Sequence, residues 1–186
     1  MLLILAATAA PLGCENQPAR PLAVPAGVAP EVVLKTPEDA ARSALTCLQA
    51  DLRAIRNRDE QAAKACLEKL RRVAAVTTIE QTLARMPQFK TIVGDDAIKG
   101  FINNWGATIA YYAAGLQLEQ MRRVSESASR VGVVVPASGP EDDALIQVTC
   151  VRGADDLWRV SRIEFVVETP TARPARPPAT QPASQP

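Results

Sequence analysis

The sequence predicts an α+β domain in which N-terminal helices pack on a C-terminal curved antiparallel sheet of three to four strands. Apolar residues recur at helical spacing over residues 36–115, and they alternate with other residues from 131 onward. Helices that precede the strands, rather than alternating with them, are typical of α+β proteins. Proline-rich stretches flank residues 36–169 and therefore confine the domain to that part of the chain.

The first helix is predicted to begin at Thr36. A threonine caps free amides, Pro37 suits the first turn, and the acidic Glu38 and Asp39 complement the helix dipole. Its apolar positions are Ala41, Leu45, Leu48, Leu52 and Ile55. Asn57-Arg58-Asp59 offers a break, and a second helical run follows it. The apolar positions of that run are Ala62, Cys66, Leu67, Leu70 and Val73.

Two more helical segments are predicted. Residues 78–86 form one, which stops before Pro87 because proline cannot continue a helix. The other begins near Asp95-Asp96 and ends near Gly115. One face of this last helix carries Ile98, Phe101, Ile102, Trp105, Ile109 and Tyr112.

The strands follow after residue 115, and residues 116–124 offer a first one. Alternating apolar residues then mark two strands, namely Val131, Val133 and Val135, and Ile146, Val148 and Cys150. Residues 138–143 turn the chain between these two strands, and residues 153–156 make the next hairpin. Residues 157–167 form the last strand, where a bulge near Ser161-Arg162 reconciles a change in the alternation.

Residues 36–168 resemble the nuclear transport factor 2-like family, which also occurs in bacterial lipoproteins of unknown function. The resemblance is carried by the sequence Thr36-Pro37-Glu38-Asp39-Ala40-Ala41 and by the hairpin Asp155-Asp156-Leu157-Trp158-Arg159-Val160. It implies a helix-lined cone closed by a curved sheet, with a hollow that often holds a ligand. Some members of the family are isomerases or dehydratases that use an Asp or His base together with a Tyr.

The N-terminus predicts export from the cytoplasm. Residues 1–13 have the length of a signal peptide and are too short to span a membrane. Gly13 before Cys14 resembles a bacterial lipobox, in which the cysteine is lipidated and becomes the first residue. A plain secretory signal and a chance apolar start remain alternatives. We expect a membrane-anchored protein of the cell envelope that faces the periplasm or the exterior.

Two proline-rich segments flank the domain. Residues 14–35 are predicted to form a Pro/Ala-rich tether. Residues 170–186 are predicted to be a disordered tail, because they cannot bury enough apolar surface to fold. This tail is either an inert solvated segment or a ligand for a proline-binding domain or an envelope polymer.

The composition excludes several classes of chemistry. Histidine is absent, so this chain alone cannot form a Ser-His-Asp or Cys-His catalytic site. The four cysteines form no CxxC pair, and we expect no metal and no cofactor. The formal net charge is +1, so we expect no nucleic-acid partner.

Cys47 and Cys66 form a candidate disulfide. If the first two helices fold back antiparallel near Asn57, the two cysteines come level with each other. If the helix is continuous, their separation of 19 residues corresponds to about 28 Å, and no bond can form. The alternative is that both are buried core residues, as we expect for Cys150.

Trp105, Tyr112 and Trp158 are candidate pocket-lining residues, although their spacing also suits an ordinary core. The acidic turns at 95–96, 141–143 and 155–156 are expected to be solvated turns or helix caps rather than calcium sites. Arginines in groups, such as Arg71-Arg72, are expected on solvated helix faces, with contact to lipid headgroups as the alternative if the domain lies near the membrane.

The leading functional expectation is a non-enzymatic α+β module of the envelope that binds an envelope protein or a small apolar ligand. The alternative is a small cone-fold enzyme that transfers a proton on an apolar ligand. Such an enzyme would need an acid with a raised pKa, buried among aromatic side chains.

Overall fold

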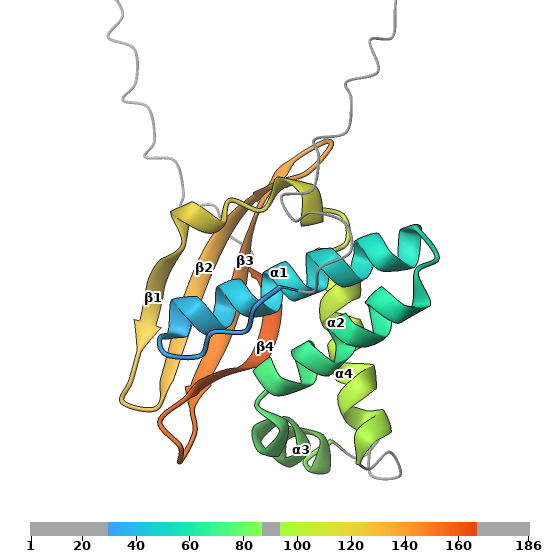
Figure 1. Cartoon of the computed structure of the whole chain (residues 1–186). Coiled ribbons are helices and arrows are strands. Elements are labelled where there is room, and N and C mark those ends of the chain that lie inside the picture. The colour runs from blue at the N-terminus through green and yellow to red at the C-terminus, as the bar shows by residue number, and fades with distance from the viewer. Residues whose placement is uncertain (1–29, 87–93, 167–186) are drawn as a thin grey trace, which may run out of the picture.

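Four α-helices are followed by a four-stranded antiparallel sheet in the computed structural model, which describes residues 30–86 and 94–166 (Figure 1). The helices are α1 (Pro37–Arg56), α2 (Glu60–Val73), α3 (Val76–Ala84) and α4 (Asp95–Ile109). The strands are β1 (Arg122–Glu126), β2 (Arg130–Ser138), β3 (Asp143–Arg152) and β4 (Trp158–Val166), in that order across the sheet. The predicted α+β class is therefore confirmed.

Helix α1 begins at the predicted cap. The Asp39 amide donates to the Thr36 hydroxyl over 3.1 Å, and the Thr36 amide donates to the Asp39 carboxylate over 3.2 Å. The helix ends at Arg56, and Arg58 reverses the chain with a φ of 56°. Helices α1 and α2 lie side by side as a hairpin (Figure 1). Ile55 departs from the predicted buried face, since 60% of its surface is exposed beside the turn that joins the two helices.

The core lies between α1 and the sheet, which curves around this helix (Figure 1). The alternating residues of β2 and β3 that were predicted to face inward are buried: Val131, Val133, Val135, Ile146, Val148 and Cys150. In β4 the pairing shifts by one residue opposite Thr149 and Cys150, which leaves Ser161 as the extra residue of a bulge. The predicted bulge is therefore confirmed, and it keeps both Val160 and Ile163 in the core.

Two predicted boundaries differ from the structure. Helix α4 ends at Ile109 rather than near Gly115, because the chain turns there into a short 3₁₀ segment, Ala113–Gly115. The first strand begins at Arg122 rather than near 116, after a second 3₁₀ turn, Leu118–Gln120. The segment from 87 to 93 lies outside the described residues, as do both termini.

Residues 30–35, which the sequence assigned to the tether, are bonded to the folded unit. The Ser43 hydroxyl donates to the Val33 carbonyl and accepts from the Val33 amide. The Lys69 ammonium donates to the Pro30 carbonyl, and the Trp158 amide donates to the Leu34 carbonyl over 2.9 Å. The packed unit therefore begins before Thr36.

Candidate functional site

The three aromatic candidates are separated in the structure. Trp105 is 1% exposed in the core and stacks edge-on against Phe101, and its indole N–H has no partner among the described residues. Trp158 is half-buried against the core beside Leu34. Tyr112 lies at the other end of the sheet and donates to Asp142 over 2.8 Å. None of the three lines the groove beside α3 or the smaller pocket beside the β2–β3 turn, both formed by described residues.

Cys47 and Cys66 both lie buried in the helical hairpin, as free thiols. Burial, and secondarily the nearby Cys66 sulfur, raises the pKa of the Cys47 thiol to about 12. Burial likewise raises the pKa of Cys66. Both groups are therefore protonated and unreactive at neutral pH. The antiparallel arrangement that a disulfide would need is present, while the disulfide itself stays a prediction.

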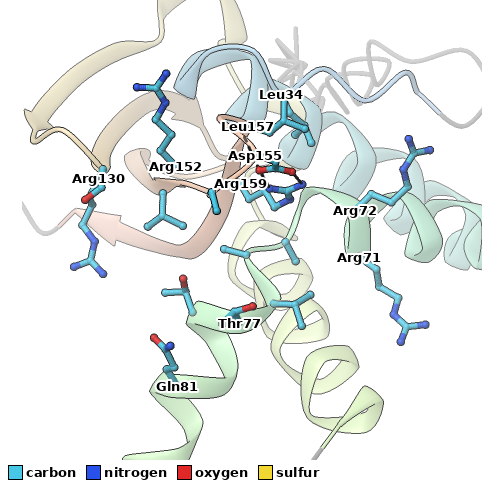
Figure 2. A pocket seen from close by; sticks show the side chains of 18 of the residues that line it. Leu34, Arg71, Arg72, Thr77, Gln81, Arg130, Arg152, Asp155, Leu157 and Arg159 are labelled. Atoms are coloured by element: carbon cyan, nitrogen blue, oxygen red, sulfur yellow. Dashed lines mark hydrogen bonds and ion pairs between the residues drawn. The ribbon is translucent and has the colours of Figure 1, made fainter.

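An open groove of about 1050 Å³ lies between α3 and the end of the sheet that carries the β3–β4 turn (Figure 2). Arginines are prominent in its lining: Arg71, Arg72, Arg130, Arg152 and Arg159. Among the described residues of the lining, Asp155 is the one acidic residue. We call this feature the arginine groove.

The fold explains why these side chains meet. Arg130 pairs with Val151, and Val151 pairs with Arg159, so the three lie in a row across β2, β3 and β4. This row is on the face opposite the core, because the neighbouring Cys150 and Val160 face inward. The Ala75 amide donates to the Val160 carbonyl over 2.8 Å, which fixes the start of α3 beside the same row.

Three of the five arginines form ion pairs with carboxylates. Arg159 holds Asp155 with two parallel bonds of 2.8 and 2.6 Å, and this contact lowers the pKa of Asp155 to about 2. Arg152 lies 3.3 Å from Asp156. Arg71 binds Asp95, which lowers the pKa of that carboxyl.

Arg72 and Arg130 differ from these three. Neither side chain has a carboxylate or hydrogen-bond partner within residues 30–86 and 94–166, and both are exposed. Figure 2 shows them on opposite sides of the groove, Arg72 from α2 and Arg130 from the start of β2. The groove therefore carries two uncompensated positive charges at its rim.

The remaining polar groups of the groove are mostly neutral donors. Thr77 and Thr78 lie in the first turn of α3, which has no side-chain cap, and Ser127 and Ser129 lie between β1 and β2. No aromatic residue lines the groove. Because arginines and hydroxyls surround it, the arrangement suits an anion better than the apolar ligand predicted from the sequence.

The structure matches the proton-transfer alternative only in part. Burial raises the pKa of Asp51 in α1, but this side chain is half-buried, and the fully buried polar residues of the described chain are Ser43 and Gln49. Among the same residues there is no cluster of three or more potential metal ligands. No described helix has the length and hydropathy required to cross a membrane.

Sequence analysis missed the arginine groove. It assigned Arg71-Arg72 to a solvated helix face and gave no role to Arg130, Arg152 or Arg159. The five residues come from α2, β2, β3 and β4, and only the strand register brings them together. The one available signal was local, namely the arginines that flank the β1–β2 and β3–β4 turns.

Cys14 and the proline-rich tail of residues 170–186 lie outside the described residues. Comparison of the chain with protein-family models, with curated proteins and with solved structures gives no significant match.

Proposed function

We propose that this protein is an exported, lipid-anchored module of the cell envelope that binds an anionic ligand or an acidic partner in the arginine groove. The observation that carries the proposal is the local charge of the groove. Five arginines line it against one aspartate, and that aspartate is already neutralised by Arg159.

The local charge of the groove, rather than the net charge of the chain, determines whether an anion binds there. Charges more than about 10 Å apart are largely screened at ordinary salt concentrations. The net charge of +1 averages over the whole chain, whereas a ligand in the groove meets the arginines around it. Two of them have no internal partner, so they can bind a ligand without first breaking an ion pair. The groove is also large enough for a small organic molecule or a peptide segment.

The proposed anchor is Cys14, supported by the apolar run before it and the small Gly13. Acyl chains contribute about 0.8 kcal/mol for each buried methylene, so a doubly acylated cysteine holds a protein on a bilayer without further contacts. The resemblance to the nuclear transport factor 2-like family belongs to the same proposal and adds a precedent for a ligand-binding α+β module.

Anchoring is tested by fractionation of bacterial cells that express the full chain or its Cys14→Ser variant. We expect the wild-type chain in the membrane fraction, with an intact mass that begins at Cys14 and includes acyl chains. The Cys14→Ser variant should lack the acyl mass. An unacylated, soluble wild-type protein would reject the anchor.

Groove binding is tested with fluorescently labelled dextran sulfate, a general polyanion, and the full chain carrying Cys14→Ser. We expect Arg72→Ala/Arg130→Ala to weaken binding at least tenfold, since hydrogen bonds to charged groups contribute about 1.5–3 kcal/mol each. The control Arg56→Ala/Arg122→Ala removes the same charge from exposed positions outside the groove. Equal losses in both variants would show that binding depends on total charge and would refute the site.

A further inference from the structure

The chemistry of the arginine groove narrows the class of its ligand. Resting on the proposed function, we infer that the groove recognises a ligand with two or more phosphate groups, which bridges Arg72 on α2 and Arg130 on β2. The ligand is a small phosphorylated molecule or a phosphate-bearing headgroup, and not a nucleic acid.

The cations of the groove are all arginine, although the chain also contains lysine. A guanidinium presents its N–H groups as a planar fork and binds two oxygens of one anion at once, whereas lysine acts as a point charge. Arg159 already binds Asp155 in this way inside the groove. The unpaired Arg72 and Arg130 have the same capacity, which suits either a phosphate or a carboxylate.

The neutral donors favour phosphate over carboxylate. Thr77 and Thr78 are hydroxyl-bearing residues of the lining, and they lie in the first turn of α3, which has no side-chain cap. The Val76 amide is already bonded to the Ala74 carbonyl, so the hydroxyls are the donors assigned to the ligand. A phosphate has a third oxygen that can accept such a bond while two others face an arginine, and a carboxylate has only two oxygens. The helix end adds to the arginine cluster here and does not form the site alone.

The positions of the two unpaired arginines argue for more than one anionic group. They lie on opposite sides of the groove, and their exposed side chains are directed away from each other (Figure 2). The groove volume of about 1050 Å³ greatly exceeds that of a single inorganic anion. One small anion would satisfy one arginine and leave the other unused. A ligand with two separated phosphates neutralises both.

The absence of aromatic residues from the lining distinguishes this ligand from a nucleic acid. Proteins that bind single strands stack the bases on aromatic side chains, which contributes about 1–3 kcal/mol for each base. The described groove provides no such surface. Its contacts are with the anionic groups of the ligand.

The test is isothermal titration of the full chain carrying Cys14→Ser with three probes: tripolyphosphate, citrate and hexaglutamate. We expect tripolyphosphate to bind at least tenfold more tightly than citrate at equal ionic strength. Arg72→Ala/Arg130→Ala should remove this binding, and Arg56→Ala/Arg122→Ala should retain it. Thr77→Val should weaken the binding of tripolyphosphate at least threefold and leave the affinity for citrate unchanged.

A second arm identifies the source of the phosphates, by flotation of the same protein with vesicles that contain cardiolipin, whose headgroup carries two phosphates, and with phosphatidylcholine vesicles as control. Groove-dependent binding to cardiolipin, displaced by tripolyphosphate, assigns the site to lipid headgroups. Binding of tripolyphosphate without vesicle binding assigns it to a soluble ligand. Both results support the inference.

Two different results would overturn the inference that the groove recognises phosphate groups, and the experiment distinguishes between them. If citrate or hexaglutamate binds as tightly as tripolyphosphate, and through Arg72 and Arg130, the phosphate preference is wrong while the anion-binding function stands. If no probe binds through these arginines, the proposed function fails as well. Thermal unfolding of each variant establishes that the comparison is made between folded proteins.

Discussion

The two ends of the sheet are built in opposite ways. At the end with the β1–β2 and β3–β4 turns, arginines surround an open groove and two of them have no partner. At the end with the β2–β3 turn, acidic residues lie beside Tyr111 and Tyr112, and the polar groups bond to one another. Positive and negative residues are therefore concentrated at opposite ends of the strands, and they nearly cancel in the net charge of +1.

The two ends also differ in packing, because aromatic rings and glycines pack closely at the acidic end. Tyr112 stacks edge-on against both Tyr111 and Phe165, and Gly139 lies directly beneath the two tyrosine rings. Gly115 approaches the backbone of Ser138 so closely that a side chain has no room. The tyrosine cluster of the acidic end is packed by direct contacts, while a second pocket of about 490 Å³, lined by Asp143 and Val166, lies at the same end of the sheet. Side chains without a partner among the described residues, rather than charge alone, therefore distinguish the basic end.

The largest effect is expected from Gly115→Ala, which tests the close packing of the acidic end. An added Cβ would lie 1.9 Å from the Ser138 carbonyl oxygen, so the backbone must move. We expect a loss of about 3 kcal/mol or more in the free energy of unfolding, measured with urea. The control is Gly100→Ala in α4, where no atom lies within 4 Å. It should stabilise the protein by about 0.5–1 kcal/mol, and equal effects would contradict the packing argument.

The next largest effect concerns binding at the basic end. Arg72→Glu/Arg130→Glu places two negative charges at the groove, so we expect the affinity for tripolyphosphate to fall about 100-fold. The control, Glu141→Lys, adds positive charge at the acidic end. Because that site is remote from the groove, it should leave the affinity unchanged in a titration at physiological salt. A clear gain from Glu141→Lys would mean that net charge governs binding.

A smaller effect is expected from Tyr112→Phe, which removes one bond of the acidic end. The hydrogen bond to Asp142, followed by burial, raises the pKa of Tyr112 to about 12 from the usual 10.0. The stabilisation by the Tyr112–Asp142 hydrogen bond is therefore complete below pH 10 and is lost as the pH rises through about 12. We expect the melting temperature to fall by a few degrees at pH 7. The highest step of the tyrosinate absorbance titration should disappear, and its persistence would assign that step to another group.

The smallest effect is expected from Asp155→Asn at the basic end. The bond to Arg159 holds the pKa of Asp155 at about 2, so this carboxylate stays ionised down to that pH. Substitution with asparagine frees Arg159 for a ligand, and we expect the affinity for tripolyphosphate to rise roughly threefold. The same change at Asp156, which pairs with Arg152 nearby, is the matched comparison. A fall in affinity after Asp155→Asn would show that the pair positions Arg159 for binding.

Local signals in the sequence predicted much of the fold. The cap at Thr36, the break at Asn57 and the bulge at Ser161 each depend on a few adjacent residues, and each was predicted correctly. The end of α4 was placed too late, because an apolar run continues to Tyr112 while the chain turns at Ala110. Contacts with the sheet, which no local pattern encodes, decide that boundary.

The arginine groove could not be predicted in the same way. Arg72 and Arg130 are 58 positions apart in the sequence, and they meet one groove because Ala75 bonds to Val160 and Arg130 pairs with Val151. Both links join distant segments of the chain. The aromatic residues were easier to notice because they are rare, and the structure places Trp105 in the core rather than in a site.

The bond from the Trp158 amide to the Leu34 carbonyl has a mechanical consequence. A pull on the N-terminal side of the chain does not act on the first turn of helix α1 alone, because residues 30–34 are bonded to three different elements. It is transmitted through Pro30, Val33 and Leu34 to Lys69, Ser43 and the first residue of β4. Leu34 also lines the groove, so tension on the N-terminal segment acts on the rim of the arginine groove as well as on the buried Ser43.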